Sequence, residues 1–287
     1  MTGAAAIVRY ALEESLRRRV FLIVLLLTAA FLGLYALGTR EAFQEVEEFD
    51  AAEPALAAVD ERTLAGATLL GLSMFGTLFL GAVLAVFLTL AVVRGDAERG
   101  ILQPLVVRPI GRTVLLASRF AAAAGVSALY VALVFAGAAG ITYWAGGWWP
   151  DSFAQPALEL AGGVVVIAAL SLLGSVFLSA TANGIAVFML FGAGLVAGLL
   201  GQIGEALQSD RLKEIAQAAS WALPFEALYQ DALDAISSES FGLTQEALQL
   251  GPFGGAQAGG PELLPWTLAY LAAIGVVAAL AFRRRDL

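Results

Sequence analysis

Long apolar runs with almost no charge recur along this chain and limit the folds that are open to it. About 20 helical residues cross the hydrocarbon core of a bilayer. Six runs reach or approach that length: Val20–Leu37, Leu69–Val93, Val114–Tyr143, Ala157–Ala180, Gly184–Gly204 and Leu264–Phe282. Only 14% of the residues are charged, against about 25% in a typical soluble domain. The sequence therefore predicts an all-α polytopic membrane protein, with a six-span transmembrane domain over residues 20–287.

The charged residues between these runs are segregated by sign. Eleven of the 16 basic residues lie before the first run, between the second and third runs, or after the last run, and a twelfth, Arg119, lies near the start of the third run. Acidic residues gather instead in the segments 38–68 and 205–263. Lys and Arg next to a span stay in the cytoplasm. Both termini and the segment 94–113 are therefore predicted to be cytoplasmic, and the two acidic segments are predicted to be extracytoplasmic loops.

Residues 1–19 are predicted to form a short amphipathic helix at the cytoplasmic membrane interface. Apolar side chains recur on one side, and charged ones on the other. A loose N-terminal tail is the alternative interpretation. A cleaved signal peptide is disfavoured, because the apolar run that follows is longer than a signal peptide requires and because further spans follow it.

Two helical stripes occur in the acidic segment 205–263. They consist of Leu212, Ile215, Ala216 and Ala219, followed by Phe225, Leu228, Tyr229, Ala232, Leu233 and Ile236. Glu226, Asp231 and Asp234 fall on other faces of the second stripe, and Pro224 suits the first turn of a helix. The pattern predicts two helices packed on the outer face of the membrane, followed by a Gly- and Pro-rich connector. Packing against the outer ends of the bundle is favoured over a dedicated substrate-binding domain.

The composition removes most kinds of catalytic site. The chain has no Cys and no His, so thiol nucleophiles, imidazole bases and the usual zinc or haem sites are absent. The phosphate-binding motif G-x-x-x-x-G-K-[ST] does not occur either. No catalytic residue, metal site or cofactor is predicted for this chain.

The cytoplasmic segment contains a short predicted helix, "DAERGILQPL". Asp96 can cap it, and acids in its first turn suit the helix dipole. Gly100 weakens its middle and Pro104 limits its length. Such a helix, projecting from two long spans, could act as a handle through which a partner moves both spans together. The alternative is an ordinary loop that its arginines keep in the cytoplasm.

The longer stretch "DAERGILQPLVVRPIGRTVLLASRF" resembles the first cytoplasmic loop of the permease subunits of class-two ABC exporters. The matching positions are Asp96, Glu98-Arg99-Gly100, Arg108-Pro109, Arg112 and Arg119. The resemblance extends to the "LRRRVF" that precedes the first span, the six spans and the closing "FRRRDL". The acidic segment after the fifth span is larger here than in the compact members of that family.

This resemblance implies the membrane subunit of an ATP-driven exporter in a bacterial inner membrane. Two permease copies would form a homodimer, and two separate ATP-binding cassette subunits, which would bind ATP and Mg²⁺, would dock beneath them. The helix in the first cytoplasmic loop would be the coupling helix. The residues that the resemblance assigns to it are Asp96, Glu98, Arg99, Gly100, Ile101, Leu102 and Pro104.

Charged residues are scarce inside the predicted spans. Charges there usually mark ion pathways or proton relays, so proton-coupled transport is disfavoured. A hydrophobic or amphipathic substrate suits such a pathway. Thr77 and the helically spaced Ser171, Ser175 and Ser179 are the mildly polar candidates. They either line a pathway or form hydrogen bonds between helices, and the second interpretation is favoured.

Two other functional classes compete with a transporter. One is a non-transporting membrane anchor, in which an ATPase partner drives a shape change that regulates an extracytoplasmic protein. The other is an intramembrane enzyme, which the lack of Cys and His disfavours. Membrane lipid is an expected partner in every case, and no nucleic-acid partner is predicted.

Overall fold

The computed structural model describes residues 19–52, 61–90, 112–237 and 256–284, and in these ranges it contains helices and no strands. The helices are α2 (Arg19–Ala52), α3 (Glu61–Thr89), α5 (Arg112–Gly146), α6 (Ala154–Phe177), α7 (Ala180–Ala206), α8 (Asp210–Ala222), α9 (Pro224–Ser237) and α11 (Leu263–Arg283). Six of them are long and apolar enough to cross a membrane, namely α2, α3, α5, α6, α7 and α11. The prediction of an all-α polytopic membrane protein with six spans is confirmed.

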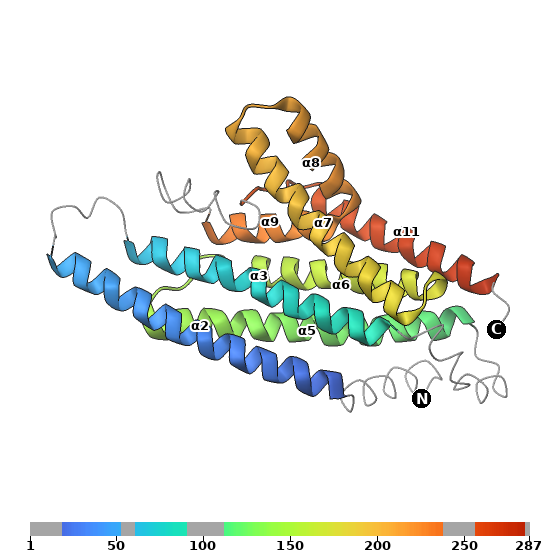
Figure 1. The fold of residues 1–287 in the computed structure, drawn as a ribbon, viewed down its shortest axis with the longest axis horizontal. Helices are drawn as coiled ribbons and strands as arrows, with labels where there is room; N and C mark the ends of the chain where they lie inside the picture. Colours follow the sequence, from blue (N-terminus) through green and yellow to red (C-terminus); the bar gives the residue numbers. More distant parts are fainter. Residues whose placement is uncertain (1–18, 53–60, 91–111, 238–255, 285–287) are drawn as a thin grey trace.

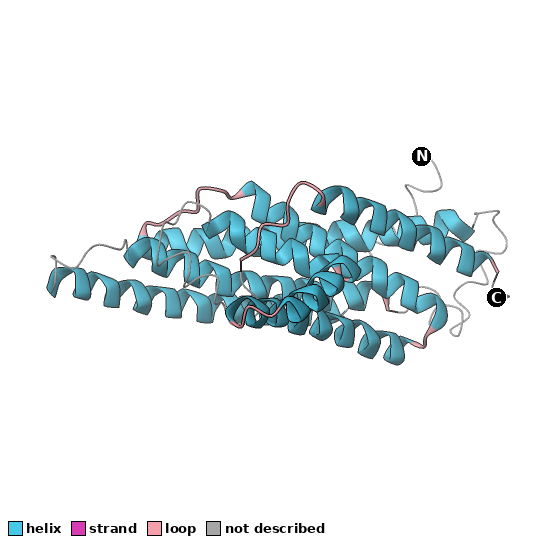
Figure 2. Ribbon diagram, turned by 90° about the horizontal axis from the view of Figure 1, so that it is seen from above, coloured by secondary structure: helices cyan, strands magenta, loops and turns pink. Residues whose placement is uncertain are grey.

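Four of the spans form an elongated bundle, and the rest of the chain packs on one side of it. Helices α2, α3, α5 and α6 run alongside one another, whereas α7 leans away from them (Figure 1). The view from above shows the same elongated outline, with the long helices running roughly along it (Figure 2). Helices α3 and α6 form the centre of the bundle, and α2 lies at its periphery.

The burial of the spans follows this arrangement. In the most apolar stretch of α3, 67% of the residues are buried within the chain, against 11% in that of α2. Large apolar side chains such as Leu22, Leu26 and Leu34 are exposed along α2. Such a stripe on a 34-residue helix suits contact with lipid chains rather than with water.

Gly81 lies where α3, α5 and α6 come closest together. A Cβ atom at this position would collide with Val131 Cγ2 of α5 and would lie 2.9 Å from Val164 Cγ2 of α6. Membrane helices have no hydrophobic driving force that brings them together, so they associate by close packing. Small residues at a crossing allow that close approach. Gly81 therefore sets the spacing of the three central spans.

Hydroxyl pairs join α2 to α5 within this otherwise apolar bundle. The hydroxyl groups of Thr28 and Tyr130 are hydrogen-bonded, and Tyr35 Oη lies 2.6 Å from Thr142 Oγ1. Three of these four side chains, all but Tyr35, are buried. Each pair satisfies polar groups that hydrocarbon could not solvate.

Two predicted boundaries are wrong. The first span was expected to end at Leu37, but α2 continues to Ala52, and buried Phe43 packs against Gly146 of α5 beyond the apolar run. The fifth span was expected to start at Gly184, but α7 begins at Ala180, and Leu178 and Ser179 make the link from α6. Thr-Ala-Asn-Gly is typical of a turn. Here the Asn183 side chain is fully buried and bonded to α6, which allows the helix to start earlier.

The two ends of the bundle carry opposite charge. The end that holds the starts of α2, α5 and α7 carries Arg19, Arg112, Arg119, Arg283 and Arg284, and no Asp or Glu of the described ranges lies there. We call it the basic end. The opposite, acidic end carries Glu41, Glu45, Glu61, Asp151, Glu159, Glu205, Asp210, Glu214, Glu226, Asp231, Asp234 and Glu262, with only four described basic residues among them, Arg40, Arg62, Arg211 and Lys213.

Helices α8 and α9, joined at Leu223, lie at the acidic end, and we call this pair of helices the hairpin. Gly204 and Gly201 of α7 approach Leu212 and Ala216 of α8, so α8 runs back along α7. Phe225, at the start of α9, then lies against Gly163 of α6. The two helices predicted here are present. However, they run beside α6 and α7 for part of their length, whereas the sequence predicted that they pack on the outer face, against the ends of the bundle.

Candidate functional site

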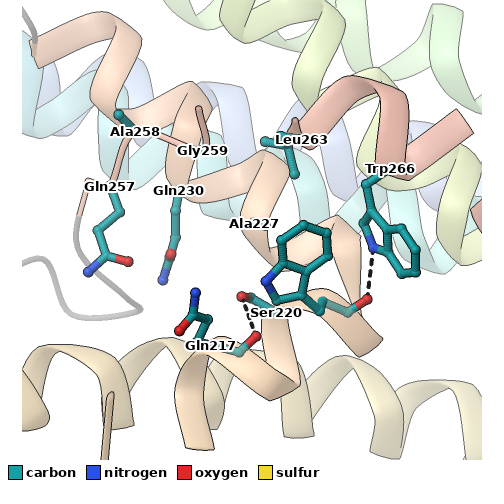
Figure 3. A pocket seen from close by; sticks show the side chains of 10 residues that line it. Gln217, Ser220, Ala227, Gln230, Gln257, Ala258, Gly259, Leu263 and Trp266 are labelled. Carbon is teal, nitrogen blue, oxygen red and sulfur yellow. Dashed lines mark hydrogen bonds between the residues drawn. The ribbon is translucent and has the colours of Figure 1, made fainter. Parts of the chain in front are cut away.

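A polar cavity lies between α7, α8 and α9. It has a volume of about 240 Å³, and its lining includes Gly198, Gly201, Glu205, Lys213 and Glu226. A second space of about 200 Å³ adjoins it between α8, α9 and the start of α11. Both spaces are lined by Gln217, Ser220, Gln230 and Gln257. We call the two together the hairpin cavity; Figure 3 shows the second space.

Glu226 is the buried acid of this cavity. Only 2% of its surface is exposed, and its Oε1 atom has no hydrogen-bond partner among the described residues. Burial raises the pKa of Glu226 to about 8, since a carboxylate away from water loses its solvation. An unpartnered carboxyl group at this depth is unusual, because buried polar groups are normally hydrogen-bonded.

The backbone of α7 makes room for that carboxyl group. A Cβ atom on Gly198 would collide with Glu226 Oε1 and would lie 2.9 Å from Gln230 Nε2. Glycine here therefore lets both side chains lie directly against α7. Gln230 is one helical turn after Glu226 on α9, so the same face of α9 presents both groups to the cavity.

Carboxamide groups supply most of the remaining polar lining. Gln217 comes from α8, Gln230 from α9, and Gln257 from the segment before α11. Gln257 Nε2 donates a hydrogen bond to Glu205 Oε1 at 2.9 Å, which ties that segment to the end of α7. Figure 3 shows the side chains of Gln217 and Gln230 extending toward each other across the space. Each amide offers both donors and acceptors to a ligand.

An aromatic pair closes the other side of the cavity. The rings of Trp221 and Trp266 meet edge to face with centroids 5.2 Å apart. Trp266 Nε1 donates to the Trp221 carbonyl at 3.0 Å, and Tyr270 Oη donates to the Ala222 carbonyl at 2.8 Å. These bonds satisfy carbonyl groups at the end of α8 that have no partner within the helix. They also fix α8 against α11.

A second buried acid lies outside this cavity. Glu159 of α6 is 4% exposed, and its Oε2 atom has no hydrogen-bond partner among the described residues. It faces Asp231 of α9, whose Oδ1 atom accepts a 2.7 Å hydrogen bond from the backbone N–H of Gly259. Glu159 does not line either space of the hairpin cavity.

The seven predicted coupling residues, Asp96, Glu98, Arg99, Gly100, Ile101, Leu102 and Pro104, lie within 91–111, outside the described residues. The helix predicted for residues 1–19 also falls outside them, apart from Arg19, which begins α2. Both assignments stay predictions.

The mildly polar candidates of the spans have separate surroundings. Ser171 is fully buried and accepts a 2.7 Å hydrogen bond from Thr89 Oγ1 of α3, and its carbonyl accepts a 2.8 Å bond from Asn183 Nδ2 of α7. Ser175 is buried and donates to the Leu172 carbonyl of its own helix, whereas Ser179 is exposed. Thr77 is buried, and its hydroxyl group has no hydrogen-bond partner among the described residues. Ser171 thus bonds between helices, and the structure does not join the four into one polar stripe.

The bonds of Ser171 lead to a testable prediction. We expect Ser171→Ala to lower the free energy of unfolding by about 0.6 kcal/mol, the typical size of a hydrogen bond between membrane helices. Ser175→Ala is the matched control, because it removes a bond within one helix only. Thermal unfolding in detergent micelles would compare the two variants, and an equal effect would contradict the bridging role of Ser171.

Sequence reasoning missed the hairpin cavity. Glu226 was placed among the polar faces of its helix, whereas the structure buries it. The available signal was that Glu226 lies between Phe225 and the apolar pair Leu228 and Tyr229 of the helical stripe. An acid that faces solvent fits such a position less well.

Comparison with known proteins gives one family. A family model described as ABC-2 family transporter protein matches residues 5–287. No curated protein matches the chain.

Proposed function

Because the chain belongs to the ABC-2 transporter family and is a membrane permease subunit of an ABC transporter, we propose that it exports a hydrophobic or amphipathic substrate. The family match over residues 5–287 is the observation that carries this proposal. The family implies an ATP-binding cassette partner, which would bind the ATP and Mg²⁺. In this proposal two permease copies form a homodimer above two such subunits.

The proposed orientation places the basic end in the cytoplasm of a bacterial cell and the acidic end outside its inner membrane. Arginines gather at the basic end, and basic residues next to spans are retained in the cytoplasm. Both termini are then cytoplasmic. The hairpin of α8 and α9 lies toward the extracytoplasmic side.

The proposed coupling element is the segment 94–113, which joins α3 to α5. Thr89 ends α3 and Arg112 begins α5, and both lie at the basic end. The two helices pack closely at Gly81, so a force applied to the segment would move them together. This is the arrangement that a coupling helix around Glu98 requires.

The polarity of the described spans supports an apolar or amphipathic substrate. Few charged residues lie toward the middle of the six spans. Arg119 lies near the basic end and Glu159 near the acidic end. A pathway between such helices would favour a substrate that brings its own apolar surface. Export is the direction that the resemblance to class-two exporters implies.

Co-purification with a candidate ATP-binding subunit tests the proposal. We expect Glu98→Ala and Gly100→Pro each to leave membrane insertion intact and to uncouple ATP hydrolysis from substrate transport, because each alters the short helix that would transmit force. The control is Glu214→Ala on α8, an exposed acid at the opposite end. Transport and hydrolysis would be measured in vesicles of the reconstituted complex. Unchanged coupling in both loop variants would contradict the proposed role of segment 94–113.

The alternative is a non-transporting anchor that regulates an extracytoplasmic protein. One observation favours it, since none of the residues of α8 is buried and the helix keeps a face uncovered by the rest of the described chain. Vesicle transport separates the two candidates, because an anchor would hydrolyse ATP through its partner without moving an amphipathic substrate.

A further inference from the structure

We propose that the hairpin cavity binds the primary ammonium group of an amphipathic ligand, with the Glu226 carboxylate as its counter-ion. The inference deepens the proposed function by naming the head group of the substrate, and it rests on that function only for the claim that the ligand is transported. Binding itself belongs to this chain alone and can be measured without an ATPase.

The unpartnered carboxyl oxygen is the first observation that points to a ligand. Glu226 is 98% buried, given its 2% exposure, and it lines the larger space with Oε1 unpaired in the described chain. Burying a charge is strongly unfavourable unless the charge is paired and hydrogen-bonded. A cation placed against Oε1 would supply the missing partner.

The neighbouring groups suit a donor-rich cation. A primary ammonium group carries three N–H donors and accepts no hydrogen bond. Glu226 Oε1 could take one of these donors, and the carboxamide groups of Gln217 and Gln230, which line the same space, each carry an oxygen that can accept another. A quaternary ammonium group has no N–H donor, so the same lining would discriminate against it.

The cavity has room for a head group and a short apolar segment. Its two adjoining spaces measure about 240 and 200 Å³, whereas one water molecule occupies about 30 Å³ of liquid. The space farther from Glu226 is bounded by Trp266, Leu263 and Ala227, which can pack against methylene groups. This combination of one charged pole and one apolar wall fits an alkylammonium ion.

The surrounding charges favour a cation over an anion. The larger space holds Glu205 and Glu226 against the single basic side chain of Lys213, and further acids of the acidic end surround the hairpin. Such a field raises the local concentration of cations and lowers that of anions. Tyr229 is the neighbouring titratable group on α9; burial and then the Glu226 charge raise its pKa, so it stays neutral.

The test uses the full chain in detergent micelles, with hexylammonium as the probe and isothermal titration calorimetry as the measurement. The buffer is held at pH 8.5, because burial raises the pKa of Glu226 to about 8 and because a primary alkylammonium, like a lysine side chain, keeps its proton there. We expect hexylammonium to bind, and hexyltrimethylammonium and hexyl sulfate to bind at least about tenfold more weakly.

Three variants locate the site. Glu226→Gln should weaken hexylammonium binding at least about tenfold, since it removes the buried counter-ion. Gly198→Ala keeps the charge but displaces the carboxyl group, and it should weaken binding as well. Glu159→Gln removes a buried acid that does not line the cavity, and it should leave binding unchanged. A thermal unfolding curve for each variant shows that it is folded.

Several results would overturn the inference. These are no binding to the unaltered chain, equal binding by Glu226→Gln, or tighter binding of hexyl sulfate than of hexylammonium. Failure of the ammonium-binding inference can be distinguished from failure of the proposed function. Lost binding with intact ATPase coupling would reject the site alone, whereas intact binding without coupling to any ATPase would reject the transport proposal alone.

Discussion

Replacing Gly81 with leucine is expected to lower the free energy of unfolding by more than about 3 kcal/mol and to reduce the yield of folded protein sharply. Even a single added methylene group in a packed core costs about 1–3 kcal/mol. At Gly81 the first added carbon already collides with Val131, and Val164 lies on the other side at 2.9 Å. Neither branched side chain can rotate away, since both are fully buried.

Gly33→Leu is the matched control. Gly33 lies in a span too, but on exposed α2, where nothing lies within 4 Å of an added Cβ. A leucine there meets lipid or detergent and also favours the helix over glycine by up to about 1 kcal/mol. The recovery of monodisperse protein and its melting temperature in detergent would be compared for the two variants. Equal melting temperatures would show that the three central helices can separate at little cost.

The second large effect concerns the pH dependence of stability. Burial raises the pKa of Glu226 from an ordinary value of 4.5 to about 8, so the folded chain holds this proton more tightly than the unfolded chain does. The stabilisation from the protonated group is fully present below pH 4.5. It decreases as the pH rises from 4.5 toward 8. Burial also raises the pKa of Asp234 on the same helix, and this adds to the decrease with the same sign.

We therefore expect the melting temperature of the ligand-free chain to fall between pH 5 and pH 8.5. Glu226→Gln should reduce this slope, and at pH 8.5 its free energy of unfolding should exceed that of the unaltered chain by on the order of a few kcal/mol. Glu262→Gln, which removes an exposed carboxyl group near the start of α11, is the control and should keep the slope. Parallel pH profiles of the chain and Glu226→Gln would contradict the assignment of this effect to Glu226.

The architecture could be predicted because membrane insertion depends on simple local quantities. Six runs of sufficient length and low charge correspond to the six long helices of the structure. The segregation of arginines from acids in the sequence reappears as the basic and acidic ends of the bundle. Both features depend on the solvent around each segment and need no knowledge of which helices touch.

Features that depend on contacts between helices could not be predicted in the same way. The continuation of α2 to Ala52 depends on Phe43 meeting Gly146 of α5. The early start of α7 depends on Asn183 finding the Ser171 carbonyl on α6. In the second case the local sequence favours a turn, and a distant partner overrides that preference.

The hairpin cavity illustrates the same limit for the candidate site. Gly198, Gln217, Glu226 and Gln257 come from α7, α8, α9 and the segment before α11. None of them belongs to a motif, and an acid in the first turn of a helix is ordinary. Glu226 is buried only because the hairpin folds back along α7.

Helix α3 makes contacts at widely separated positions along its length. Its last residue, Thr89, adjoins the segment proposed to meet the ATPase, while Gly71 lies under Leu233 and Ile236 of the hairpin. The two positions are about 27 Å apart along a single uninterrupted helix. A rigid rod of this kind needs no chain of side-chain rearrangements to carry movement from one side of the bilayer to the other. Tilting α3 would at the same time move the surface on which α9 packs.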